Sequence, residues 1–137
     1  MVTPNSSPPW LRAIEVNVVV DNEPIPVSPA TEVPAGDIGG YAGTAETYQA
    51  AASWTVSTGK IGVLKEILII SDDYAHTLVT IVVAGVTLES GWSPTSVMPL
   101  IYEDLTLAAG AVVAVTVRSS DGTAIDVDVV IVGKEVG

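Results

Sequence analysis

The chain has 137 residues, no cysteine and a formal net charge of -11 at pH 7. This length suits one domain with a single core, and the lack of cysteine excludes disulfides and thiolate metal sites. Because only five lysines and arginines are present, the composition argues against binding to nucleic acid and against binding to an anionic membrane surface.

The amino-acid composition favours strands over helices. Val, Ile, Ala, Thr and Gly are frequent, whereas Phe is absent and Lys is scarce. Long amphipathic helices need Leu, Glu, Lys and Gln in number, and β-branched residues prefer strands. We therefore predict an all-β protein.

The first predicted region, residues 1–47, is an extended N-terminal arm rich in proline and glycine. Its apolar residues recur at every second position over residues 13–20, which predicts one strand. The prolines that follow, from Pro24 to Pro29, hold the backbone extended and cannot donate hydrogen bonds inside a sheet. We therefore expect the arm to bind a neighbouring subunit rather than its own core. The predicted contact residues are Trp10, Ile14, Val16, Val18, Ile25 and Val27.

The second predicted region, residues 48–137, consists of short strands separated by turn residues. Several short strands at this spacing indicate an antiparallel sandwich or barrel. For residues 40–52, rich in alanine and tyrosine, a short helix is the alternative. The predicted strands are 52–57, 61–71, 77–84, 86–89, 99–107, 111–119 and 124–133.

Two of these strands are apolar on both faces, at residues 67–70 and 129–132. A strand of a two-layered sandwich normally leaves one face in water. An uncovered apolar face would be an exposed hydrophobic patch that promotes association or aggregation. We therefore expect the arm or another subunit to cover the outside of these strands, and the chain to form a homo-oligomer.

His76 is the only histidine, and it lies in a predicted turn at residues 71–77. A serine hydrolase would need it as the catalytic base, yet no Gly-x-Ser-x-Gly motif accompanies it. No phosphate-binding or dinucleotide-binding motif occurs either. We interpret His76 as a polar loop residue and predict that the chain is not an enzyme and binds no cofactor.

Carboxylates gather in several predicted turns, and oxygen-rich loops can bind calcium. The spacing of an EF-hand is absent, so we predict no metal site and leave a surface calcium site as an alternative. On the last strand, carboxylates alternate with valines, which favours a solvent-exposed strand face. The clusters are Asp72–Asp73, Glu103–Asp104 and the group of Asp121, Asp126 and Asp128.

The aromatic residues allow sugar binding as another interpretation, because tryptophan and tyrosine rings stack on sugars. In a chain without Phe, these residues must also fill the core. Trp54, in an alternating strand, is predicted to be buried. Trp92 and Tyr74, beside turn residues, are the better candidates for a surface role.

Two stretches resemble proteins of phage particles. Residues 18–27, VVVDNEPIPV, resemble the Val-x-Asn-x-Pro-Leu-Pro-Val strings of phage structural proteins. The order of WTVSTGKIGVLKEI at 54–67, LTLAAG at 105–110 and SSDGT at 119–123 resembles small jelly-roll proteins of phage particles. The resemblance covers most of residues 50–135. It implies a capsid decoration (cement) protein, typically trimeric, with an extended arm and without catalytic residues.

These observations lead to one functional prediction. The chain is expected to be a non-enzymatic decoration protein on the capsid exterior of a phage virion. Its fold is predicted to be a jelly-roll β-sandwich of about eight short antiparallel strands, with the sandwich formed by residues 48–137 and preceded by the arm. As a trimer, it would bridge subunits of the major capsid protein through its arm. The alternative is a carbohydrate-binding module or the receptor-binding head of a phage fibre, which predicts exposed aromatic side chains around one concave surface.

Overall fold

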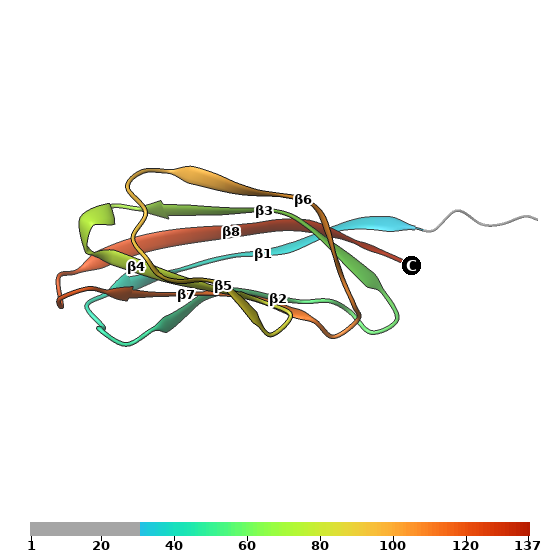
Figure 1. The fold of residues 1–137 in the computed structure, drawn as a ribbon, viewed down its shortest axis with the longest axis horizontal. Helices are drawn as coiled ribbons and strands as arrows, with labels where there is room; N and C mark the ends of the chain where they lie inside the picture. The colour runs from blue at the N-terminus through green and yellow to red at the C-terminus, as the bar shows by residue number, and fades with distance from the viewer. Residues whose placement is uncertain (1–30) are drawn as a thin grey trace, which may run out of the picture. The chain divides into compact units, whose positions relative to one another are not determined.

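Eight strands and one short helix make up residues 31–137, the part of the chain that the computed structural model describes (Figure 1). The 3-10 helix η1 (Tyr74–His76) lies between the third and fourth strands. The strands are β1 (Glu32–Gly43), β2 (Gln49–Thr55), β3 (Ile61–Ser71), β4 (Thr77–Val83), β5 (Val86–Trp92), β6 (Met98–Leu107), β7 (Val112–Ser119) and β8 (Ile125–Val136).

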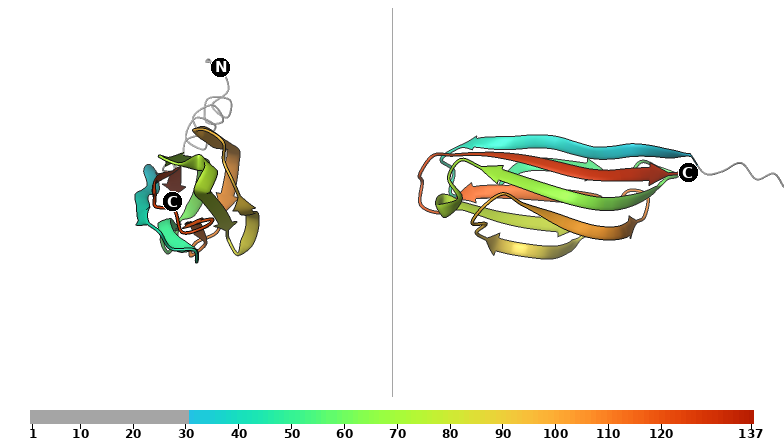
Figure 2. Two further views of the ribbon diagram at one scale, coloured as in Figure 1. Left: turned by 90° about the vertical axis from the view of Figure 1, so that its left-hand side faces the viewer. Right: turned by 90° about the horizontal axis from the view of Figure 1, so that it is seen from above.

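The strands form two antiparallel sheets of four, in the orders β1-β8-β3-β6 and β2-β7-β4-β5. Figure 2 shows the two sheets stacked face to face. Apart from the β4–β5 hairpin, each strand is followed by a strand of the opposite sheet, which is the connectivity of a jelly roll. The predicted all-β sandwich of about eight antiparallel strands is confirmed.

The core lies between the sheets and is almost entirely aliphatic. Successive side chains of a strand point to opposite faces, so alternate residues of β7 and β8 face inward. Trp54 is only 5% exposed, which confirms its predicted place in the core. The inward residues of these two strands are Val113, Val115, Val117, Ile125, Val127, Val129 and Ile131.

The sandwich begins earlier in the chain than predicted. Residues assigned to the arm form β1, which pairs with β8 along its whole length from Glu32 to Gly43. The strand was missed because it carries proline and glycine, which are tolerated at the edge of a sheet. Gly36 has a φ of +139°, and a Cβ added there would collide with the carbonyl oxygen of Ile131. The boundary at residue 48 is therefore wrong.

The alternative helix over residues 40–52 is also wrong. β1 continues to Gly43, and β2 begins at Gln49. Ala52 and Trp54 lie two positions apart and are both buried, which is the period of a strand. The predicted strand over residues 13–20 lies outside the described residues.

Candidate functional site

The face of the β1-β8-β3-β6 sheet that points away from the core, called the outer face below, is apolar at its centre. One row of paired residues crosses all four strands there. The row reads Ile38, Val130, Leu68 and Pro99 from β1 to β6. The sequence predicted both faces of β3 and β8 to be apolar, and their alternate residues do point to opposite sides.

Several of these outward side chains are strongly exposed. Ile38 is 79% exposed and Ile101 is 65% exposed, while Ile70 and Val132 are 38% and 39% exposed. Single exposed aliphatic residues are ordinary on a protein surface. Here they share one face of one sheet, with Glu66 between Val132 and Ile101 in the pairing. Large exposed apolar groups are typical of interaction surfaces.

A groove of about 550 Å³ runs along the outer face between β1 and β8. Gly36, which pairs with Val132, contributes only backbone atoms to its lining. Ile38 stands at one side of the groove. The groove is lined by Pro34, Ala35, Gly36, Asp37, Ile38, Val130, Ile131, Val132 and Gly133.

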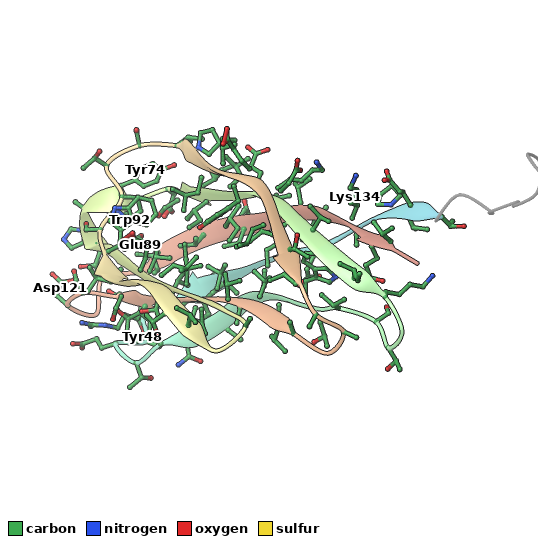
Figure 3. All side chains as sticks on the ribbon, turned by 45° about the vertical axis from the view of Figure 1, so that its right-hand side comes forward. Tyr48, Tyr74, Glu89, Trp92, Asp121 and Lys134 are labelled. Carbon is green, nitrogen blue, oxygen red and sulfur yellow. The ribbon has the colours of Figure 1, made fainter. Side chains whose placement is uncertain are left out.

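The charges on β8 differ between the two ends of the outer face. Asp126 and Asp128 are exposed near the start of β8. Lys134 lies near its end, where Nζ is 3.1 Å from a carboxylate oxygen of Glu32. Figure 3 shows Lys134 at the opposite end of the sandwich from Asp121. The apolar centre is thus flanked by two carboxylates on one side and by the ion pair of Lys134 and Glu32 on the other.

A second lysine at this end of the sheet forms an ion pair across β3 and β6. Nζ of Lys65 is 2.9 Å from a carboxylate oxygen of Asp104. The hydrogen bond and positive charge of Lys65 lower the pKa of Asp104. Both partners are largely exposed, so this pair adds little to stability.

His76 lies between two carboxylates at the other end of the sandwich. Its Nδ1 is 2.8 Å from Asp73, and its Nε2 is 3.6 Å from Asp121 in the β7–β8 turn. The hydrogen bond to Asp73 raises the pKa of His76, and the negative charge of Asp121 adds to the effect. A hydrolase triad needs one ring nitrogen on a nucleophilic hydroxyl. Here both nitrogens face carboxylates, so the geometry is that of a polar connection between turns.

The acidic clusters are likewise bound into turns. Oδ1 of Asp72 accepts a hydrogen bond from the backbone N–H of Asp126 at 2.9 Å. Asp126 and Asp128 are exposed, as predicted for a solvent-exposed strand face. Within residues 31–137, no three His, Cys, Asp or Glu side chains gather closely enough to hold a metal ion. In the same residues, no helix has the length and hydrophobicity to cross a membrane.

The two aromatic residues predicted at the surface lie near each other (Figure 3). Ser93, which follows Trp92, donates a side-chain hydrogen bond to the carbonyl oxygen of Tyr74 at 3.5 Å. Both aromatic residues are only partly exposed, and Trp92 packs against the core. The hydroxyl of Tyr74 is buried and has no hydrogen-bond partner among the described residues.

Sequence reasoning missed the two most exposed large hydrophobic residues of the outer face. Ile38 lies between Asp37 and glycines, and Ile101 follows a proline-containing segment, so neither shows an alternating pattern. The pairing of β1 with β8 brings Ile38 into the apolar row, and the pairing of β6 with β3 places Ile101 beside Glu66 on the same face. The predicted contact residues Trp10, Ile14, Val16, Val18, Ile25 and Val27 all lie outside the described residues.

No protein-family model matches the sequence, and no curated protein matches it. Among solved structures, the chain is similar to the CBM36-1 domain of a multidomain xylanase from the hindgut metagenome of Trinervitermes trinervoides. The sequence identity is 16%, the match covers 78% of this chain and 97% of that chain, and the TM-score is 0.38. These values are too low for the similarity to indicate a function.

Proposed function

We propose that the chain is a non-enzymatic structural protein of a phage virion, which decorates and stabilises the capsid from its exterior. The apolar outer face of the β1-β8-β3-β6 sheet carries this proposal. Each large aliphatic side chain left in water forgoes about 1.5–3 kcal/mol of burial free energy. A chain with a net charge of -11 stays soluble with such a face exposed, and a protein contact recovers that free energy.

The places of the resembling segments in the jelly roll support the proposal. Residues 54–67 lead from the end of β2 into β3, and residues 105–110 end β6 and enter the next turn. Residues 119–123 form the turn between β7 and β8. Small jelly-roll proteins of phage particles carry similar segments in this order.

In the proposed mode of action, three copies form a trimer that bridges subunits of the major capsid protein. The N-terminal arm supplies the reach, and its contact residues are Trp10, Ile14, Val16, Val18, Ile25 and Val27. Linked contacts raise the effective affinity without any new chemistry. The function is therefore mechanical, and no residue of the chain is assigned a catalytic role.

The test is cosedimentation of the full chain with capsid shells of the phage whose genome encodes it. We expect wild-type protein to bind and a chain starting at residue 31 to fold but bind weakly. A triple variant, Ile14→Ser, Val16→Ser and Val18→Ser, should also bind weakly. The matched control changes the alternate positions, Glu15→Ser, Asn17→Ser and Val19→Ser, and should keep binding. Capsid affinity unchanged by both the deletion and the first triple variant would refute the proposal.

The trimer is tested separately by sedimentation equilibrium of the isolated protein. A trimer has three times the 14.1 kDa mass of the chain. Removal of residues 1–30 should reduce this mass to that of smaller species, because the arm supplies the proposed threefold contacts. A wild-type protein that stays at the single-chain mass would contradict the trimer.

The second candidate, a carbohydrate-binding module or the receptor-binding head of a phage fibre, is favoured by the closeness of Trp92 and Tyr74. Partly exposed aromatic side chains in one region suit sugar stacking. A glycan array separates the two candidates. Binding to a glycan that is lost in Trp92→Ala would favour sugar recognition, whereas a protein that binds no glycan fits the decoration protein.

A further inference from the structure

The outer face is self-complementary along β1 and β8. On β1, the exposed side chain of Ile38 lies two positions from Gly36, above which the groove is open. On β8, Asp128 lies three positions before Ile131, and Lys134 lies three positions after it. Asp37 and Ile131 are paired across the two strands. Ile38 and the groove at Gly36 lie on opposite sides of the line through these two residues. Asp128 and Lys134 also lie on opposite sides of it.

We infer that a second copy of this chain binds the outer face with its strands antiparallel, about a twofold axis along the line of Asp37 and Ile131. The twofold rotation places Ile38 of one copy opposite Gly36 of the other, and Asp128 of one copy opposite Lys134 of the other. Each copy therefore inserts Ile38 into the groove above Gly36 of the other. Symmetric contacts of this kind are the commonest way in which identical chains associate.

The charges select this orientation over the parallel one. With parallel strands and the twofold axis along β8, Asp128 of one copy faces Asp128 of the other. With antiparallel strands, Lys134 faces the Asp128 carboxylate of the other copy. Lys134 already pairs with Glu32 at 3.1 Å, but its ammonium group has three donors. Opposite charges across an interface fix its register in this way.

The size of the face sets the strength of the contact. Four strands and seven residues of β8 span roughly 19 by 23 Å at the usual spacings of a sheet. Two such faces bury about 900 Å² in flat area, which is below the roughly 1,200 Å² of a standard stable interface. We therefore expect a weak pair, with a dissociation constant in the micromolar range or above. This contact is separate from the proposed threefold contacts, which are assigned to residues 1–30.

Zero-length carbodiimide cross-linking of the full chain tests the inference directly. Equal amounts of unlabelled and heavy-nitrogen protein are mixed, cross-linked at high protein concentration and digested for mass spectrometry. We expect mixed-label peptides that join Lys134 to Asp128. Within one copy these residues lie about 20 Å apart along a single strand, so this link must come from two copies. The link between Lys134 and Glu32 within one copy serves as the internal reference.

Substitutions on the two sheets provide the matched comparison. Ile38→Asp should lower the yield of the mixed-label link at least tenfold and leave the Lys134–Glu32 link unchanged. Ile38→Ser serves as a second variant if the aspartate disturbs folding. Val86→Asp, on β5 of the other sheet and also strongly exposed, should leave both links unchanged. Absence of the mixed-label link, or a yield insensitive to both Ile38 variants, would overturn the inference.

Discussion

The indole Nε1–H of Trp54 donates a hydrogen bond of 3.1 Å to Oε2 of Glu135, which joins β2 of one sheet to β8 of the other. The backbone N–H of Ser57 donates to the same carboxylate oxygen at 3.1 Å. The hydrogen bonds from Ser57, and then that from Trp54, lower the pKa of Glu135. A buried indole needs a partner for its N–H, and this carboxylate provides it.

This relationship predicts a pH-dependent contribution to stability. A carboxylate whose pKa is lowered in the folded state stabilises the fold above its ordinary pKa, and the contribution is lost as the pH falls through the folded value. Glu135→Gln should therefore lower the melting temperature at neutral pH and reduce its dependence on pH in the acidic range. Thermal unfolding followed by circular dichroism measures both effects. Glu103→Gln, an exposed carboxylate on β6, is the control, and parallel curves for all three proteins would disprove the prediction.

The two faces of β3 predict unequal effects of the same substitution. Ile67 is fully buried, whereas Ile70 of the same strand is 38% exposed on the outer face. Ile67→Ala should lower the free energy of unfolding by about 2–5 kcal/mol through lost burial and a cavity. Ile70→Ala should cost less than about 1 kcal/mol in the isolated chain. Chemical denaturation of both variants checks this order, and equal losses would mean that the outer face is covered within one copy.

Trp54 and Trp92, which differ in burial, form a second matched pair. Trp54 is 5% exposed, and replacing a buried tryptophan by alanine costs about 3–5 kcal/mol. Trp92 only packs against the margin of the core, so Trp92→Ala should cost clearly less. Denaturant unfolding of each variant provides the comparison. A Trp92 variant as unstable as the Trp54 variant would place Trp92 in the core.

The connection through His76 predicts a titration that depends on two carboxylates. Asp73→Asn should lower the pKa of His76 more than Asp121→Asn, because the 2.8 Å hydrogen bond outweighs the more distant charge. Since the folded pKa is raised, the connection is strongest below the unfolded pKa of histidine and is lost as the pH rises through the folded value. Nuclear magnetic resonance titration of the imidazole measures the shift. An unchanged pKa in Asp73→Asn would exclude the proposed cause.

Several strands could be predicted well because their signal is local. The predicted strand over residues 61–71 coincides with β3, and the pattern of β8 correctly divided inward valines from outward aspartates. Period-two alternation results from the geometry of a single strand. It needs no knowledge of which strands are neighbours, so the sequence carried it alone.

The candidate surface could be predicted only in part. Residues 67–70 and 129–132 correctly indicated an apolar outside on two strands. The groove above Gly36 and the projecting Ile38 were missed because β1 shows no alternation. Gly36 and Gly40 allow close pairing with β8, and Gly39 allows a close approach to Ala51 of β2. These glycines leave no hydrophobic pattern to recognise.

The amino-acid order by itself determined that the protein is all-β, which residues of β3 and β8 share a face, and that Trp54 is buried. Each of these properties depends on neighbours within a few residues. Tertiary structure alone decided the order β1-β8-β3-β6, the bond from Trp54 to Glu135 and the arrangement of the outer face. These features join segments from opposite ends of the chain, and pairing over such distances is fixed by packing and hydrogen bonding in the folded state.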